Sequence, residues 1–353
     1  MKKTVRAFSL ISGLIIAAAF SQSAFAELVC PGLQPRPFSS IETKIDLGGG
    51  KIIDSKNIDC KKVAVGADMV TNIRKMLGKE VASPAQIKFR MVDQFDNAFF
   101  NPEDISLNVP YKLVLGDYSK NPVYSIPVWA HEFGHAILDY NLAKMQPKWV
   151  ATLVKRMENR ENIRRNSAGV VDYMLGSYHE FFADVVAVLY TGKGDIVSRG
   201  IYMTGFIANE EGRPGLCPNS DPKCRPRTRG HASGDNASMR VSLTQRDFTD
   251  RSNELSRWTD PTPNDSHTAL APARYDLYKY YIANPLYRHQ ESTILAILGS
   301  AIVNDVSRRI DRITNVKGII TDDAIDAEFS DNHRLNSEFM KTLDSYLDKG
   351  LRK

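Results

Sequence analysis

The chain has 353 residues, 42% of them hydrophobic, and its 46 Lys and Arg against 41 Asp and Glu give a formal charge of +5. This composition is too apolar for a disordered protein, and 22 glycines and 17 prolines exclude collagen-like and low-complexity chains. The length suffices for one large domain or two small ones with a sizeable buried core.

The first 26 residues have the features of a secretory signal. Three basic residues open the segment, an apolar run follows over residues 7–20, and Ala24-Phe25-Ala26 supplies the small residues that signal peptidase requires. We therefore expect residues 1–26 to be removed from a bacterial protein that is exported to the periplasm or the medium. An uncleaved membrane anchor is the alternative, but the run is short for a spanning helix.

Removal of this segment changes the meaning of the charge. The mature chain carries a net charge of only +2, so its basicity does not favour nucleic acid as a partner. No other stretch reaches about 18 apolar residues, so the sequence predicts no transmembrane segment after cleavage.

The four cysteines, Cys30, Cys60, Cys217 and Cys224, all lie in the mature chain. An even number of cysteines in an oxidising compartment favours disulfides, and four cysteines allow three pairings. We favour the local pairs Cys30–Cys60 and Cys217–Cys224, because the segment between the last two is short, polar and rich in turn residues. A cysteine zinc site would need two C-x-x-C pairs, which are absent.

The N-terminal region, residues 27–85, is either a pro-segment or a subdomain. Glycines at positions 48–50 predict a turn that leads into a strand. Residues 63–78 have the apolar spacing of a helix that ends at a glycine.

Residues 86–206 form the predicted central region, which contains the two chemical motifs described below. Short strand-like runs come first, at residues 87–92, 98–100 and 105–114. Pro110 lies in the last of them and predicts an edge strand. Three helices are expected next, at residues 126–142 with Pro127 in its first turn, 149–165, and 170–190, which is strongly apolar.

The remaining sequence divides into two parts. Residues 207–266 are rich in Asn, Asp, Pro, Gly and Arg and predict a long polar loop insertion at the surface. Residues 267–353 form a helical C-terminal region with a core helix near residues 294–306. The predicted fold is therefore α+β, with a small mixed sheet packed on the helix at 126–142 and a mainly helical C-terminal half.

The first chemical motif is His131-Glu132-Phe133-Gly134-His135, inside this helix. Residues four apart share one face of a helix, so both imidazoles can reach one metal ion. Glu132 lies beside them and can contact a water on that metal. Two neutral imidazoles and a carboxylate suit a zinc ion that keeps one position open for water.

The second motif is Glu180 with Asp184, four residues apart on the apolar helix. Burial of a carboxylate without a partner costs free energy, so Glu180 and Asp184 are expected to have compensating partners in the fold. A metal and its histidines supply such partners: Glu180 as the third zinc ligand, and Asp184 as the acceptor for the second ring N–H of a ligand histidine.

H-E-x-x-H followed by E-x-x-x-D resembles the signature of the gluzincin group of zinc metallopeptidases. The resemblance implies a zincin-like fold in which His131, His135 and Glu180 bind one Zn²⁺ ion, Glu132 is the general base, and Asp184 supports a ligand histidine. It covers the two motifs and the helices that carry them, which is about a third of the chain.

The long step between the motifs is similar to the branch with the prenyl-protein endopeptidases and periplasmic quality-control peptidases. In that branch a later histidine and arginine assist catalysis, which implies such a role for His267 and Arg274. His231, Tyr173 and Tyr178 are further candidates for the group that stabilises the oxyanion.

The sequence thus predicts a secreted zinc-dependent endopeptidase in which Glu132 assists the attack of a zinc-bound water on a peptide bond. Its partner is a peptide or protein substrate, which would pair with the predicted edge strand near residues 105–113. An ordinary core strand is an equal alternative for that run. A zinc amidase acting on cell-wall peptides and an inactive, zinc-stabilised binding protein are the alternative functions. The cleavage specificity and the oligomeric state stay open.

Overall fold

The structure is a computed structural model with an α+β fold. It describes residues 26–28, 30, 38–44, 60–92, 98–110, 113–114, 122–145, 165–201, 207–208, 225–226, 244–259, 266–314, 321–329 and 331–351. The signal segment before residue 26, the expected turn at 48–50, the helix expected at 149–165 and the pair Cys217–Cys224 lie outside these residues, apart from the last residue of that helix.

Five strands form one mixed sheet in the order β1-β2-β3-β5-β4. Their bounds are β1 (Ala26–Leu28), β2 (Phe38–Lys44), β3 (Ile87–Val92), β4 (Phe99–Asn101) and β5 (Ser106–Pro110). The three inner strands run parallel, and β1 and β4 run antiparallel to their neighbours at the two edges. A separate antiparallel pair joins β6 (Ile207–Ala208) to β7 (Arg225–Pro226).

Strand β5 is a central strand, so the prediction of an edge strand at this run is wrong. It lies between β3 and β4, and all its residues are buried. Pro110 is tolerated because it is the last residue of β5, opposite Val92, where the ladder ends and no further N–H is needed. The edge strand nearest to the motif helix is β4.

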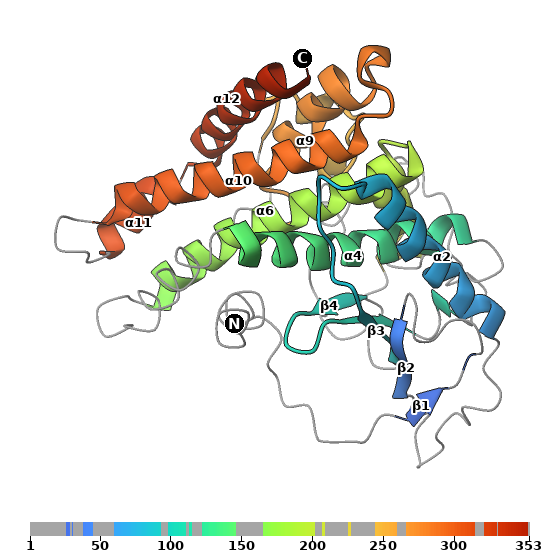
Figure 1. Cartoon of the computed structure of the whole chain (residues 1–353). Helices are drawn as coiled ribbons and strands as arrows, with labels where there is room; N and C mark the ends of the chain where they lie inside the picture. Colours follow the sequence, from blue (N-terminus) through green and yellow to red (C-terminus); the bar gives the residue numbers. More distant parts are fainter. Residues whose placement is uncertain are drawn as a thin grey trace.

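The helices stack in layers above the sheet (Figure 1). The long ones are α2 (Cys60–Leu77), α4 (Pro122–Met145), α6 (Arg165–Thr191), α10 (Glu291–Ile313) and α12 (Asn332–Leu351). Shorter elements are α7 (Ile196–Ile201), η5 (Arg251–Asn253), α9 (Ala271–Leu277), η6 (Tyr278–Ile282), η7 (Pro285–Tyr287) and α11 (Asp322–Phe329). Helix α4 contacts β4 and β5, α6 packs along α4, and α10 packs on α6 and carries α12.

Aromatic packing fixes α4 to the sheet. Phe89 of β3 lies between Phe38 of β2 and Trp129 of α4, with ring centroids 5.0 Å and 5.7 Å away. All three side chains are buried, and such contacts add to the free energy that burial supplies. Helix α2 comes close at Gly66, where an added Cβ would lie 3.0 Å from the Trp129 ring.

The two motif helices approach each other more closely than ordinary side chains allow. An added Cβ at Gly134 would lie 2.6 Å from the Cα of Ala183. The glycine inside the first motif and the alanine inside the second therefore let α4 and α6 pack almost backbone to backbone. This close packing brings the side chains of the two motifs within reach of one another.

Several sequence predictions agree with these elements, and two more need correction besides that of β5. The predicted helix at 63–78 is α2, which ends before Gly78 in a left-handed conformation (φ +59°). Helix α4 begins at Pro122, not near Pro127, so Pro127 lies inside it and removes one backbone donor. Residues 244–259, predicted as part of a surface loop, are packed into the molecule, and Phe248 and Trp258 are buried.

A disulfide joins Cys30 to Cys60 at the start of α2, the pairing that the sequence predicts. Residues 30 apart close a large loop, which restricts the unfolded chain. Among the described helices, none combines the length and the apolar character that a membrane crossing requires.

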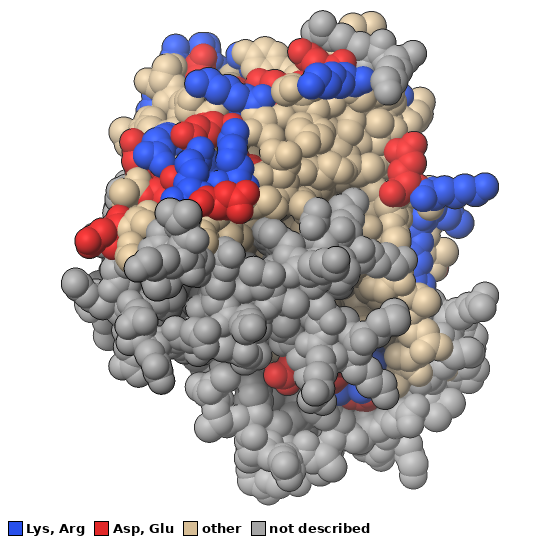
Figure 2. Space-filling model, turned by 60° about the vertical axis from the view of Figure 1, so that its left-hand side comes forward, with Lys and Arg blue, Asp and Glu red and all other residues tan. Residues whose placement is uncertain are grey.

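The C-terminal helices are joined by a buried ion network. Arg309 of α10 bonds Asp305 at 2.7 Å and Glu328 of α11 at 3.0 Å, and all three side chains are at least 95% buried. Tyr178 of α6 donates to Asp305 Oδ2, the same oxygen that Arg309 bonds. Four residues that are more exposed to solvent surround the network: Arg308, Arg312, Arg334 and Glu338. Figure 2 shows a surface patch in which charges of both signs are mixed in this way.

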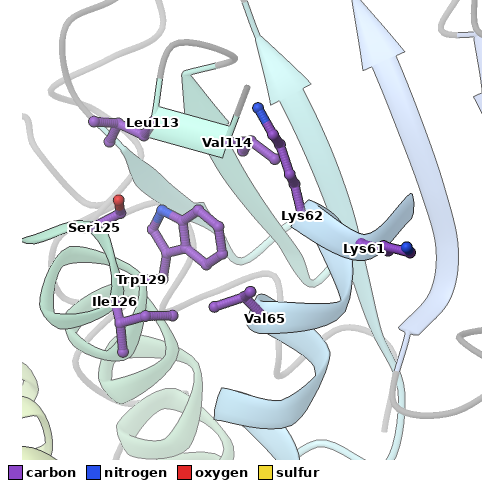
Figure 3. Close-up of a pocket in the computed structure, with 8 residues that line it drawn as sticks. All are labelled: Lys61, Lys62, Val65, Leu113, Val114, Ser125, Ile126 and Trp129. Carbon is purple, nitrogen blue, oxygen red and sulfur yellow. The ribbon is translucent and has the colours of Figure 1, made fainter. Parts of the chain in front are cut away.

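A cavity of about 120 Å³ lies between the start of α2, residues 113–114 and α4 (Figure 3). Its walls are mostly apolar, and the Trp129 ring forms one of them. Trp129 and His131 are two residues apart on α4 and so point in different directions. The cavity therefore lies on a different side of α4 from the motif histidines.

Candidate metal centre

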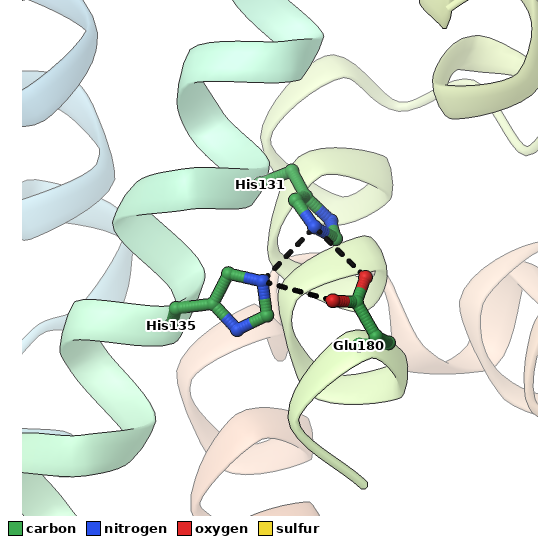
Figure 4. A group of neighbouring side chains, drawn as sticks. All are labelled: His131, His135 and Glu180. Carbon is green, nitrogen blue, oxygen red and sulfur yellow. Dashed lines mark hydrogen bonds and ion pairs between the residues drawn. The ribbon is translucent and has the colours of Figure 1, made fainter. Parts of the chain in front are cut away.

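Three side chains from the two motif helices converge on one point (Figure 4). His131 and His135 lie one turn apart on α4, and Glu180 faces them from α6. One ligand atom of each lies within 4.8 Å of the others, which makes this a group that could hold a metal ion. The structure thus brings together the three residues that the sequence predicts as ligands.

The separations fit a small tetrahedral ion. Donor atoms about 2.0–2.2 Å from one tetrahedral zinc lie about 3.3–3.5 Å from each other. His131 Nε2 lies 3.1 Å from both His135 Nε2 and Glu180 Oε2, and His135 Nε2 lies 3.5 Å from Glu180 Oε1. These separations lie within a few tenths of an ångström of those around one ion, with each histidine facing a different oxygen of Glu180.

Asp184 contacts the ring nitrogen of His131 that faces away from Glu180. Its Oδ1 lies 2.7 Å from His131 Nδ1, and the carboxylate is fully buried one turn after Glu180. A hydrogen bond from Nδ1–H to a carboxylate fixes the ring orientation and directs the lone pair of Nε2 toward the ligand point. This is the contact that the sequence predicts for Asp184.

Two arginines neutralise Asp184. Arg246 Nη2 donates to Oδ1 at 2.6 Å, and Arg274 Nε donates to Oδ2 at 2.8 Å. Burial alone would raise the pKa of Asp184, but Arg246, Arg274 and His131 together hold it well below its usual range. The carboxylate is therefore ionised at neutral pH.

The two histidines differ in charge when no metal is bound. Burial would lower the pKa of His131, but Asp184 and Glu180 outweigh it and raise the pKa to about 9. Burial holds the pKa of His135 well below its ordinary value. A metal must displace the proton of His131, so binding of an ion here is coupled to proton release.

Glu132 is buried beside the ligands and is anchored by the sheet. The backbone N–H of Phe100 in β4 donates to its Oε2 at 2.9 Å. Burial raises the pKa of Glu132 to about 7, against the opposing charge of His131. A carboxylate with a pKa near neutrality suits general base catalysis, and Oε1 is the oxygen that Phe100 leaves for it.

The predicted assisting residues take different positions. His267 Nε2 lies 3.5 Å from Glu180 Oε1, and its side chain is 43% exposed, so it borders the ligands on the solvent side. Arg274 is fully buried and faces Asp184. Tyr178 donates to Asp305, away from the ligands, and His231 and the side chain of Tyr173 lie outside the described residues.

His179 lies beside the ligands without joining them. Its ring stacks on His135 with centroids 5.9 Å apart, and its Nε2 lies 3.4 Å from Asp139 Oδ1. Burial lowers the pKa of His179 to about 4 and raises that of Asp139 to about 7. His179 therefore packs against one member of the His131, His135 and Glu180 group and is not itself part of that group.

Sequence reasoning missed Arg246 and the backbone of Phe100. Arg246 lies in the segment predicted as a surface loop, 62 residues after Asp184. The available signal was the need of a fully buried aspartate for a cation, combined with Phe248 and Trp258 as isolated aromatic residues in a polar stretch. The Phe100 contact is made by its backbone N–H, which any residue except proline supplies, so the residue type at this position does not reveal it.

The comparisons of this chain with protein families, with curated proteins and with solved structures give no match.

Proposed function

We propose that the chain is a zinc-dependent endopeptidase that hydrolyses peptide bonds in protein substrates. One observation carries the proposal: His131, His135 and Glu180 converge at distances that suit a tetrahedral ion, with Glu132 anchored next to them. An ion that served structure alone would not need a buried carboxylate with a near-neutral pKa at its side.

The donor set supports zinc as the metal. Two imidazoles and one carboxylate form a common ligand set of catalytic zinc and leave a fourth position for water or substrate. When bound, the ion would acidify a water and polarise the carbonyl of the scissile bond. His131, His135 and Glu180 would hold the ion, and Asp184 would keep His131 in the orientation that binding requires.

Within this mechanism the protein moves protons through Glu132. Oε1 takes a proton from the attacking water, while the Phe100 N–H keeps Oε2 fixed. The same carboxyl group then delivers the proton to the amine that leaves. Transfers of this kind typically accelerate a reaction about 10²–10⁴-fold. His267, half-exposed beside Glu180, is the side chain best situated to donate to the substrate carbonyl oxygen.

The substrate is proposed to be an extended peptide that binds along β4. This strand is the sheet edge on the side of α4, and in the described part of the chain it pairs only with β5. An edge strand offers unpaired backbone groups to a peptide, and Phe100 already connects it to Glu132. This arrangement also supports a zincin-like fold, with a small mixed sheet against the motif helix.

We further propose that the protein acts outside the cytoplasm. The Cys30–Cys60 disulfide supports an oxidising compartment. The basic, apolar and small-residue pattern of residues 1–26 supports export to the periplasm or the medium. N-terminal sequencing of protein recovered from the producing cells is expected to give Glu27 as the first residue, and recovery of an intact Met1 would contradict the proposal.

The enzymatic proposal is tested by metal analysis and cleavage assays on the same preparation. We expect one zinc ion per chain and cleavage of denatured casein by the wild type. Glu132→Gln is expected to bind zinc equally well and to lose activity about 10²–10⁴-fold, because the amide cannot accept the proton. Glu80→Gln makes the same chemical change at an exposed glutamate; it is the matched control and should retain activity.

The outcomes distinguish the alternatives. Equal cleavage by Glu132→Gln and wild type would contradict the mechanism. Zinc without casein cleavage, but with release of amino groups from cell-wall peptides, would favour the amidase. Zinc without any hydrolysis of either substrate would favour an inactive binding protein.

A further inference from the structure

Arg246 owes its position to a packed segment. Phe248 donates from its backbone to the carbonyl of Gly194 at 3.1 Å, and its side chain is fully buried. Asn253 Nδ2 donates to the carbonyls of Thr244 and Asp247, each at 2.9 Å. These bonds fasten residues 244–253 beside the end of α6, so Arg246 is held at the ligands by its whole segment.

One nitrogen of Arg246 faces two of the three proposed ligands. Its Nη2 lies 2.6 Å from Asp184 Oδ1, 3.6 Å from Glu180 Oε2 and 3.3 Å from His131 Nδ1. Arg274 neutralises the other oxygen of Asp184, at 2.8 Å from its Nε. The two arginines thus share Asp184, and Arg246 also reaches Glu180.

This geometry sets up a competition. A guanidinium is charged at every pH at which the protein is folded, and charges of the same sign repel strongly where water is excluded. Glu180 cannot have its full interaction with Arg246 and with a divalent cation at the same time. Asp184 does not face this conflict, because it contacts the imidazole and not the ligand point.

We propose that Arg246 is a positioning residue that shares with His131 the neutralisation of Glu180 in the metal-free protein and gives up its contact with Glu180 when the metal binds. The inference rests on the proposed metal site. It implies that Arg246 stabilises the empty protein, keeps the ligands close together, and makes zinc binding weaker than the ligand set alone would give. The bond to Asp184 stays in both states and continues to orient His131.

The test compares Arg246→Gln with Arg246→Lys by zinc calorimetry and by thermal unfolding with and without zinc. Glutamine keeps an N–H donor for Asp184 and removes the charge, so we expect zinc affinity to rise about tenfold. The metal-free protein is expected to melt at a lower temperature, so the gain in melting temperature on adding zinc widens. Lysine keeps the charge, so its zinc affinity should stay within about threefold of the wild type.

The matched control is Arg274→Gln, which removes the other charge from Asp184. It should lower the melting temperature without tightening zinc, because in the described structure Arg274 bonds Asp184 and no metal ligand. If Arg246→Gln does not fold without metal, refolding in the presence of zinc should recover it, and failure to do so would overturn the proposal.

The failure of this inference can be told apart from the failure of the proposed function. Two outcomes overturn the role of Arg246 while the wild type still binds zinc and cleaves casein. One is unchanged or weaker zinc binding by Arg246→Gln, and the other is tighter zinc binding by both Arg246→Gln and Arg246→Lys. Absence of zinc binding by the wild type overturns both.

Discussion

The protein contains two buried ion clusters, and they are built differently. The cluster on α10 and α11 is closed: Arg309 bonds Asp305 and Glu328 directly, and further arginines cover its outer side. The cluster between α4 and α6 combines three carboxylates and two histidines with only two guanidinium groups, Arg246 and Arg274. Three ligand atoms of this cluster, from His131, His135 and Glu180, lie within 4.8 Å of one another.

This difference teaches how a binding centre is distinguished from a structural network. Burial of ionised groups is common to both clusters and by itself indicates neither function. Ligand atoms that meet at separations close to those around a tetrahedral ion make the α4–α6 cluster the one that could hold a further cation. In the network every described carboxylate already has an arginine.

The largest expected effect concerns the network. Arg309→Met leaves Asp305 and Glu328 buried without their central cation, and we expect the free energy of unfolding to fall by about 3–5 kcal/mol. The loss should be the same with and without zinc, as measured by denaturant unfolding. Arg308→Met, which changes a half-exposed member, should cost less than about 1 kcal/mol. Rescue of Arg309→Met by zinc would break the distinction between the clusters.

A second prediction uses pH at the edge of the proposed metal centre. Asp139 has a pKa raised by burial to about 7, so its ionisation opposes folding fully above pH 7 and not at all below its ordinary pKa of 3.8. Asp139→Asn is therefore expected to stabilise the metal-free protein by up to about 4 kcal/mol at pH 8, a gain that vanishes near pH 4. Thermal unfolding at both pH values tests this, with the exposed Asp68→Asn as control. Loss of stability at pH 8 would contradict it.

Tyr178 tests whether the two clusters are independent. It lies on α6 two residues before Glu180, yet its hydroxyl donates to Asp305 of the network. Tyr178→Phe should lower the free energy of unfolding by about 1.5–3 kcal/mol, the usual contribution of a hydrogen bond to a charged group. Calorimetry should give an unchanged zinc affinity, and a change of more than threefold would show that the clusters are coupled.

The smallest expected effect concerns the packing between the motif helices. Gly134→Ala places a Cβ against Ala183 and should cost about 1–3 kcal/mol in unfolding free energy. It should also weaken zinc binding, since it forces α4 away from α6. Gly299→Ala in α10 is the matched control: nothing lies within 4 Å of its added Cβ, so it should gain roughly 0.5–1 kcal/mol. Equal effects of both changes would show that the close approach is unimportant.

Local pattern predicted much of this fold. The elements α2, β3, α6 and α10 follow from apolar spacing and glycine stops, and the ligand set follows from residues four apart on two helices. The contact between the helices was also accessible, because a buried carboxylate on an apolar helix requires a partner.

Contacts distant in sequence could not be predicted in this way. The central place of β5 depends on its pairing with β3 and β4, which Pro110 does not reveal. Arg246 looked like one of many arginines in a polar stretch, and only the folded chain brings it to Asp184. Strand β2 was not expected, because its alternation of polar and apolar residues is short and mixed.

Zinc calorimetry on the wild type and on Glu180→Ala tests the central claim most directly. We expect the wild type to bind one zinc ion per chain and Glu180→Ala to bind it more than about 100-fold more weakly, while His179→Ala, next to it in the sequence, stays within about tenfold of the wild type. Equal zinc affinity of wild type and Glu180→Ala, or no binding by the wild type, would contradict the assignment of this metal centre.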